Sequence, residues 1–181
     1  MPRQEVDIVR VDNEDLDGAI PTISHPHHET HEGNHFYYTE FNTIASAGTR
    51  ELLLTTPDTN KLLNFRFTVS GTLITTVRLF EGTSKTGGTA VTILNNYRDH
   101  ANVSGATLTH TPAGSGDGTA IFVTSFGSAS NPANAVGGAT SQDDEIILKR
   151  NTKYLLRVTS GSNSNVVRTK LFWYEHTYGD G

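Results

Sequence analysis

Cysteine is absent from the 181-residue chain, and methionine and tryptophan occur once each. Without cysteine, the chain has no disulfide framework, no thiolate metal ligand and no cysteine nucleophile. Charged residues make up only 18% of the chain, and the formal net charge is −5 without any cluster of lysine and arginine. This charge pattern predicts no nucleic-acid partner, because such a partner selects a basic surface.

Long apolar runs are also missing from the sequence. No run approaches the roughly 20 residues that a membrane span requires, and residues 1–5 lack an apolar signal region. We therefore expect no membrane partner and no export signal. A domain of this length buries roughly 70% of its unfolded surface, so it needs neither a disulfide nor a structural metal to fold.

Threonine, serine, asparagine and glycine are abundant, as is typical of strands with small polar outward-facing side chains. No segment shows a sustained helical period, whereas strand-like runs recur at the roughly 8–12-residue spacing of sandwiches and barrels. The expected strands cover residues 36–41, 51–55, 63–69, 73–80, 89–94, 106–111, 119–126, 144–148, 154–159 and 166–174. We expect 63–69 and 73–80 to form a hairpin. The predicted fold is all-β: an antiparallel β-sandwich, jelly-roll-like, with an extended N-terminal arm.

The chain divides into two parts by composition. Residues 1–24 are acidic and have weak strand character, which predicts an arm that becomes ordered on a neighbouring molecule. Residues 25–181 form a single β-sandwich domain. In the arm, Val6, Ile8 and Val11 are the apolar side chains expected to contact a neighbouring molecule or another subunit.

Five histidines and two glutamates gather within residues 25–35. Imidazole and carboxylate groups bind zinc or nickel, so His27, His28, His31 and His35 are candidate ligands for a divalent metal. The alternatives are a polar loop, which Gly33 favours over a stable helix, and a pH-sensitive contact, because histidine titrates near neutrality. As contact residues toward a partner, the segment offers His28, Glu29, His31 and Glu32.

The sequence offers little support for an enzyme. It contains no Gly-x-Ser-x-Gly motif and no phosphate-binding glycine loop, and residues 28–31 (HETH) are not the His-Glu-x-x-His metalloprotease motif. We therefore predict no enzymatic activity. A metal-dependent enzyme that uses the histidine cluster remains an alternative. The aromatic run 172–174 is expected to belong to the core, although exposed aromatic rings also stack on sugars.

An ordered series of short motifs resembles a known family. The motifs are residues 27–36 (HHETHEGNHF), 79–82 (LFEG), 95–98 (NNYR), 117–119 (DGT), 151–155 (NTKYL) and 171–176 (LFWYEH). The series resembles small virion proteins of tailed phages, often encoded near the major capsid protein and interpreted as head decoration or cement proteins.

The resemblance covers about residues 25–176 and carries several implications. It implies a β-sandwich that sits on the capsid surface, binds the major capsid protein and stabilises the head. It also implies a homotrimer at local three-fold positions, a location in the virion after assembly in the host cytoplasm, and no catalysis. The alternative is a virion adhesion or carbohydrate-binding module on the tail, neck or head surface.

Overall fold

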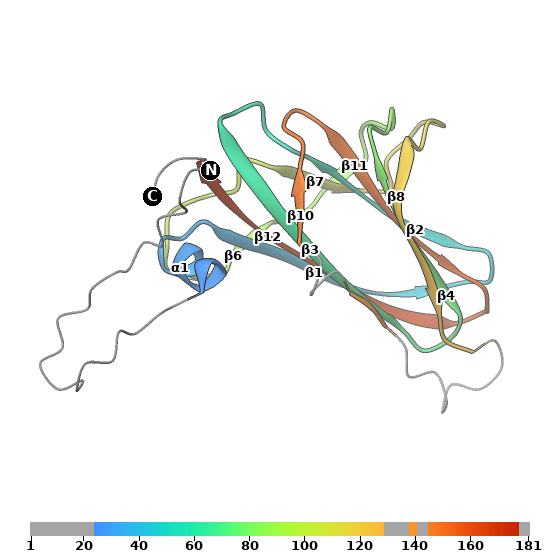
Figure 1. Ribbon diagram of the computed structural model, residues 1–181. Coiled ribbons are helices and arrows are strands. Elements are labelled where there is room, and N and C mark those ends of the chain that lie inside the picture. The colour runs from blue at the N-terminus through green and yellow to red at the C-terminus, as the bar shows by residue number, and fades with distance from the viewer. Residues whose placement is uncertain (1–23, 129–137, 141–144, 178–181) are drawn as a thin grey trace, which may run out of the picture.

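Two antiparallel sheets pack face to face in the structure, which is a computed structural model that describes residues 24–128, 138–140 and 145–177 (Figure 1). The predicted all-β sandwich is therefore confirmed. The arm predicted at residues 1–24, with Val6, Ile8 and Val11, lies outside the described residues except for Ser24.

The first sheet, sheet A, contains six strands. Five of them lie side by side in one row, and the sixth pairs with a strand of that row. The order is β10 (Ile146–Leu148), β3 (Lys61–Gly71), β12 (Asn165–Thr177), β1 (His35–Ile44) and β6 (Leu94–Asn95), with β9 (Gly138–Thr140) also paired to β3. The second sheet, sheet B, has the order β5 (Thr89–Ala90), β7 (Thr107–His110), β2 (Thr49–Thr55), β11 (Lys153–Ser160), β4 (Thr75–Glu81) and β8 (Thr119–Phe126).

The strand order is that of a jelly roll. When β5, β6, β7 and β9 are set aside, the two sheets read β10-β3-β12-β1 and β2-β11-β4-β8. Eight strands in two four-stranded sheets, with successive strands mostly in opposite sheets, define this topology. The jelly-roll-like expectation is thus confirmed.

The predicted hairpin between 63–69 and 73–80 is wrong, because β3 lies in sheet A and β4 lies in sheet B. The chain crosses between the sheets at Gly71, and Asn165 stabilises the crossing. The Asn165 side chain accepts a hydrogen bond from the Leu73 amide at 2.9 Å and donates one to Thr75 Oγ1 at 2.8 Å. Two adjacent alternating runs predict strands, but not which sheet each strand joins.

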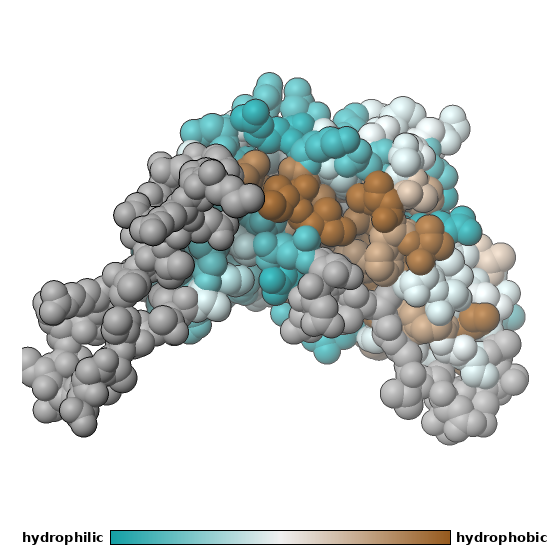
Figure 2. Space-filling view, in the orientation of Figure 1, coloured by the Kyte–Doolittle hydropathy of each residue, from teal (hydrophilic) through white to brown (hydrophobic). Residues whose placement is uncertain are grey.

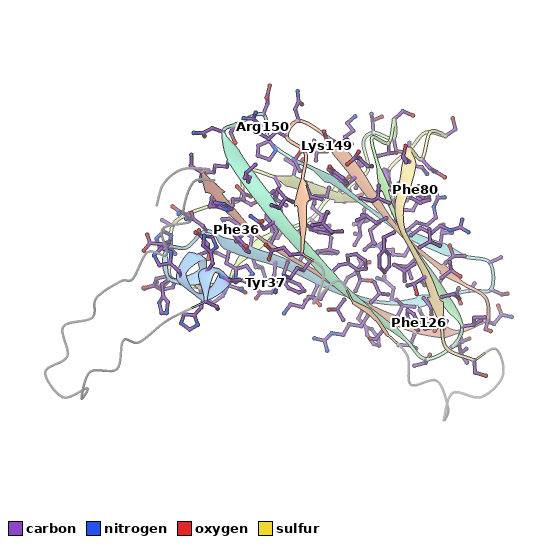
Figure 3. The ribbon with its side chains drawn as sticks, viewed as in Figure 1. Phe36, Tyr37, Phe80, Phe126, Lys149 and Arg150 are labelled. Atoms are coloured by element: carbon purple, nitrogen blue, oxygen red, sulfur yellow. The ribbon has the colours of Figure 1, made fainter. Side chains whose placement is uncertain are left out.

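The core lies between the sheets, where alternate side chains of each strand point inward (Figure 3). Phe67 and Leu156 are buried there from the two sheets, and Trp173 is only 1% exposed. Phe36 packs against Trp173 with ring centroids 6.4 Å apart. The core interpretation of the terminal aromatic run is confirmed for Trp173. Tyr174 is also buried but lies outside the core between the sheets, and Phe172 is partly exposed.

A short helix, α1 (His25–His31), replaces the polar loop expected for the histidine segment. Pro26 suits the first helical turn, because its fixed φ matches the helix and its missing N–H has no partner there. Gly33 has φ +69° just beyond the helix, so it ends the helix rather than preventing it. Glu29 faces the sheet as the buried residue of α1.

An insertion between β4 and β8, residues 82–118, extends both sheets and places its loops around Lys85 and Asp117 on the outer face of sheet B. It supplies β5, β6 and β7. Leu53, Phe80 and Leu155 are buried although they do not belong to the core between the sheets. The insertion therefore forms a second, smaller layer of packing on sheet B. Among the described residues, no helix is long and apolar enough to span a membrane.

Candidate functional site

Helix α1 packs on sheet A near the C-terminal end of β12 (Figure 1). We call the helix and the strand ends that it contacts the histidine end. The His25 ring lies 5.3 Å from the Tyr174 ring and 5.1 Å from the His176 ring. The sequence segment 25–35 is thereby brought against residues from the far end of the chain.

Glu29 joins the helix to the rest of the fold. Its carboxylate accepts a hydrogen bond from Asn34 Nδ2 at 3.2 Å and lies 3.5 Å from His25 Nε2. Of the four predicted contact residues in this segment, Glu29 is turned inward and His28 is half-buried, whereas His31 and Glu32 are exposed. His31 and Glu32 are therefore accessible to a partner, and their role as contact residues stays a prediction.

The four predicted metal ligands do not converge. His27 and His31 form a pair with their Nε2 atoms 2.8 Å apart. His28 Nδ1 lies 3.9 Å from Glu29, and His35 Nδ1 forms a hydrogen bond with Thr30 Oγ1 at 2.8 Å. In the described part of the chain, no three histidine, aspartate or glutamate side chains are placed to hold a metal ion. Metal binding by all four histidines stays a prediction, and the geometry supports only the His27–His31 pair.

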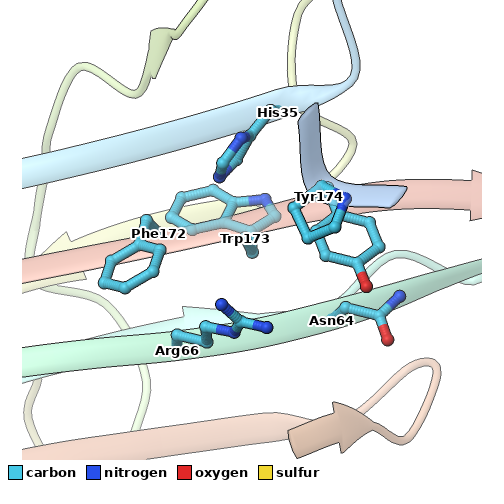
Figure 4. Close-up of a pocket in the computed structure, with 7 residues that line it drawn as sticks. His35, Asn64, Arg66, Phe172, Trp173 and Tyr174 are labelled. Carbon is cyan, nitrogen blue, oxygen red and sulfur yellow. The ribbon is translucent and has the colours of Figure 1, made fainter. Parts of the chain in front are cut away.

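His35 borders a small cavity of ≈ 20 Å³ on the outer side of sheet A (Figure 4). Burial is the main reason that the pKa of His35 falls to about 4, and the nearby Lys170 and Arg66 lower it further. Figure 4 shows His35 and Arg66 on the same side of the sheet, from strands on either side of β12. His35 is therefore neutral at physiological pH.

Tyr174 connects this cavity to strand β10. Its hydroxyl donates a hydrogen bond to Glu145 Oε1 at 2.6 Å, and Arg66 lies 2.7 Å from the other oxygen of Glu145. Burial and the hydrogen bond to Glu145 raise the pKa of Tyr174. Glu145 therefore links β3, β10 and β12 across the outer face.

A larger cleft of ≈ 310 Å³ lies beside the helix. Its lining residues are His25, His28, Glu29, Glu32, Asn34, Lys61, Glu175, His176 and Thr177. Glu175 is 2% exposed, and its carboxylate accepts hydrogen bonds from Ser104 Oγ at 2.6 Å and Trp173 Nε1 at 3.1 Å. Burial and the neighbouring His25 lower the pKa of His176. The cleft thus presents groups of both charges, which suits contact with a polar surface.

The outer face of sheet A beyond the helix is aromatic and basic. Lys170 Nζ lies 5.2 Å from the centre of the Phe172 ring and 5.9 Å from that of Tyr37, within cation–π range. Phe41 is 71% exposed and lines a shallow hollow of ≈ 390 Å³ with Arg168. We call Tyr37, Phe41, Arg168, Lys170 and Phe172 the aromatic–basic face. Aromatic residues and arginine are enriched at protein interfaces, so this face can dock another molecule.

Apolar side chains are also exposed where the edges of the two sheets approach each other. Figure 2 shows hydrophobic atoms gathered over the side of the molecule that contains β8 and β10. Ile121, Val123 and Ile147 are exposed there. This strip lies over the edge strands β8 and β10, whereas the residues of the aromatic–basic face come from β1 and β12.

The residues of the aromatic–basic face were not singled out from the sequence as a group. A usable signal was present, since Arg168, Lys170 and Phe172 alternate with Thr169 and Leu171 in a predicted strand. That alternation assigns them to one face. It does not identify the residues of β1 that lie beside them.

Comparison of the chain with protein-family models, with curated proteins and with solved structures finds no match. The interpretation of these surfaces therefore depends on their own geometry and chemistry.

Proposed function

We propose that the chain is a structural protein of a tailed-phage virion, which decorates the head by binding the lattice of the major capsid protein. The motif series described above supports this proposal. The observation that carries it is the jelly-roll topology, an architecture shared by viral capsid domains and lectins, combined with an exposed aromatic–basic face.

The aromatic–basic face is the surface proposed to contact the capsid. Phe41 supplies an exposed apolar anchor, and Arg168 beside it supplies a cation that pairs with carboxylates. Arg168 projects from β12, which is paired on both sides, and Phe41 projects from β1, which is paired to β12 along its whole length, so regular strand pairing holds the face rigid. A rigid face loses little conformational entropy when it binds.

Decoration also requires repeated attachment. We propose a homotrimer at local three-fold positions, since closed symmetric rings are common among oligomers. Several modest contacts then add to a strong attachment, because the second and third contacts form at high effective concentration. The exposed apolar strip over β8 and β10 is available for contacts between subunits.

The test is binding to phage heads that lack the protein. The full chain is mixed with undecorated heads from a phage strain without the gene, and bound protein is measured after gradient sedimentation. We expect saturable binding of the wild type and a roughly tenfold or greater loss of affinity for Phe41→Ser combined with Arg168→Glu.

Val103→Ser is the matched control, because Val103 is 86% exposed but lies in the insertion. This variant should bind as the wild type does. Absence of wild-type binding would contradict head decoration. Normal binding by the Phe41/Arg168 variant would contradict only the choice of face.

The second candidate function is a virion adhesion module that binds carbohydrate. The hollow beside Phe41, lined also by Thr39, Glu40 and Arg168, favours it, because an aromatic ring with polar neighbours is suited to stacking on a sugar. A glycan array with the wild type should then give hits that Phe41→Ser removes. An array without hits would leave head decoration as the preferred function.

A further inference from the structure

His27 and His31 lie one helical turn apart on α1, and both side chains are exposed. Their Nε2 atoms are 2.8 Å apart and their ring centroids are 4.7 Å apart. We propose that this pair binds one Cu²⁺ or Ni²⁺ ion through the two Nε2 atoms. The proposal is independent of head decoration.

The distance between the two nitrogens, which a hydrogen bond sets in the metal-free protein, also fits one geometry of metal ligands. With metal–nitrogen bonds of about 2.0 Å, two cis ligands at a right angle are about 2.8 Å apart, whereas two tetrahedral ligands are about 3.3 Å apart. The observed separation is 2.8 Å. Right-angled coordination is the preference of Cu²⁺ and Ni²⁺, while structural Zn²⁺ sites are tetrahedral.

The helix backbone holds the two rings at this spacing. Pro26 lies in the first turn of the helix, and Thr30 Oγ1 donates a hydrogen bond to the Pro26 carbonyl at 2.9 Å. Glu29 is buried against the sheet, which fixes the rotation of the helix. The helix therefore loses little further conformational entropy when a metal ion binds.

The pair has room for further ligands. One Nε2 atom donates a hydrogen bond to the other in the metal-free protein, and both must present a lone pair to the ion. When the metal binds, the donating ring moves its proton from Nε2 to Nδ1, so that both rings are protonated at Nδ1 and both Nε2 lone pairs face the ion. Since no three-residue metal cluster occurs among the described residues, water completes the coordination in the isolated chain.

The experiment uses the untagged full-length chain. Isothermal titration with Ni²⁺ should show one site, and His27→Gln or His31→Gln should weaken binding roughly tenfold or more. His28→Gln is the matched control, because His28 lies on the same helix and near Glu29 rather than near the pair. It should change the affinity less than about twofold.

Electron paramagnetic resonance of the wild-type Cu²⁺ complex provides a second measurement that needs no variant. The spectrum should show tetragonal copper with two imidazole nitrogens. Two outcomes would overturn the proposal: Ni²⁺ binding that is unchanged in both His27→Gln and His31→Gln, or a copper spectrum with fewer than two imidazole nitrogens.

Discussion

Lys85 Nζ lies 2.8 Å from Glu51 Oε2, and this contact fastens the 82–118 insertion to the outer face of sheet B. The same carboxylate accepts a hydrogen bond from Arg157 Nε at 2.6 Å. Arg157 in turn donates to Asp117 of the insertion at 2.7 Å, and these contacts lower the pKa of Asp117. Glu51 therefore pairs with both Lys85 and Arg157, at a site that is largely shielded from water.

Glu51→Gln should destabilise the protein by about 3 kcal/mol, because removal of one partner leaves largely buried charges uncompensated. The side chains of Lys85 and Glu51 are only 10% and 13% exposed. Urea denaturation followed by tryptophan fluorescence measures the change. As the control, Lys149→Met removes an ion pair with Glu81 whose lysine is 70% exposed, and it should cost less than about 1 kcal/mol. Equal losses in the two variants would contradict the role of burial.

Gly33→Ala should destabilise the protein by about 2 kcal/mol or more, since it combines an unfavourable φ with a steric clash. Gly33 has φ +69°, and a Cβ atom there would overlap the ring of His100. Gly82→Ala separates the two effects, because Gly82 has φ +71° and open space around it. Thermal unfolding of both variants should show the larger loss for Gly33→Ala, and His100→Ala should recover part of that loss.

Acid should weaken the histidine end through His35. Its pKa is about 4 in the folded protein against an ordinary 6.5, so the unfolded chain takes up the proton first. The contribution to stability is full above pH 6.5 and is lost progressively as the pH falls toward 4. His176 acts in the same direction, because its pKa is also lowered.

Urea midpoints at about pH 7 and about pH 4.5 test this prediction. The decrease between the two should be smaller in His35→Gln than in the wild type, because glutamine does not titrate. Identical decreases in the two proteins would show that other groups determine the response to acid.

Trp173, the only tryptophan, should report unfolding directly. It is 1% exposed, and its indole nitrogen donates hydrogen bonds to Glu175 and Ser104. The native protein should therefore emit at short wavelength and resist quenching by iodide. Trp173→Ala should cost about 3–5 kcal/mol, as for large core aromatics. Strong iodide quenching of the native protein would contradict this burial.

Most strand positions were predictable from the sequence because they depend on local alternation. The expected strand 89–94 is wrong, because it spans β5 and the start of β6, which join different sheets. The runs 36–41 and 166–174 correspond to β1 and β12, which are only longer at their ends. Which of the two sheets each strand joins was harder to predict from the sequence. Whether 63–69 pairs with 73–80 depends on the Asn165 contacts, and these join residues about ninety positions apart in sequence.

The candidate surfaces likewise depend partly on local sequence, which is predictable, and partly on contacts between distant residues, which are not. The histidine pair follows from i, i+4 spacing once a helix is assumed, but the segment has no apolar helical face to predict the helix. Its anchor is Glu29, a buried charged residue whose partner Asn34 lies beyond the helix. The aromatic–basic face required the register of β1 against β12, which pairs Tyr37 with Phe172 and Phe41 with Arg168.

The insertion also makes the two margins of the sandwich differ in the length of their edge strands. At one margin it ends the two sheets with two-residue strands, β5 and β6, and such short margins offer little backbone for strand-to-strand addition. At the opposite margin of sheet B, β8 is eight residues long and is paired only to β4 among the described strands. In sheet B, addition of a strand from another chain is thus favoured at β8 rather than at β5.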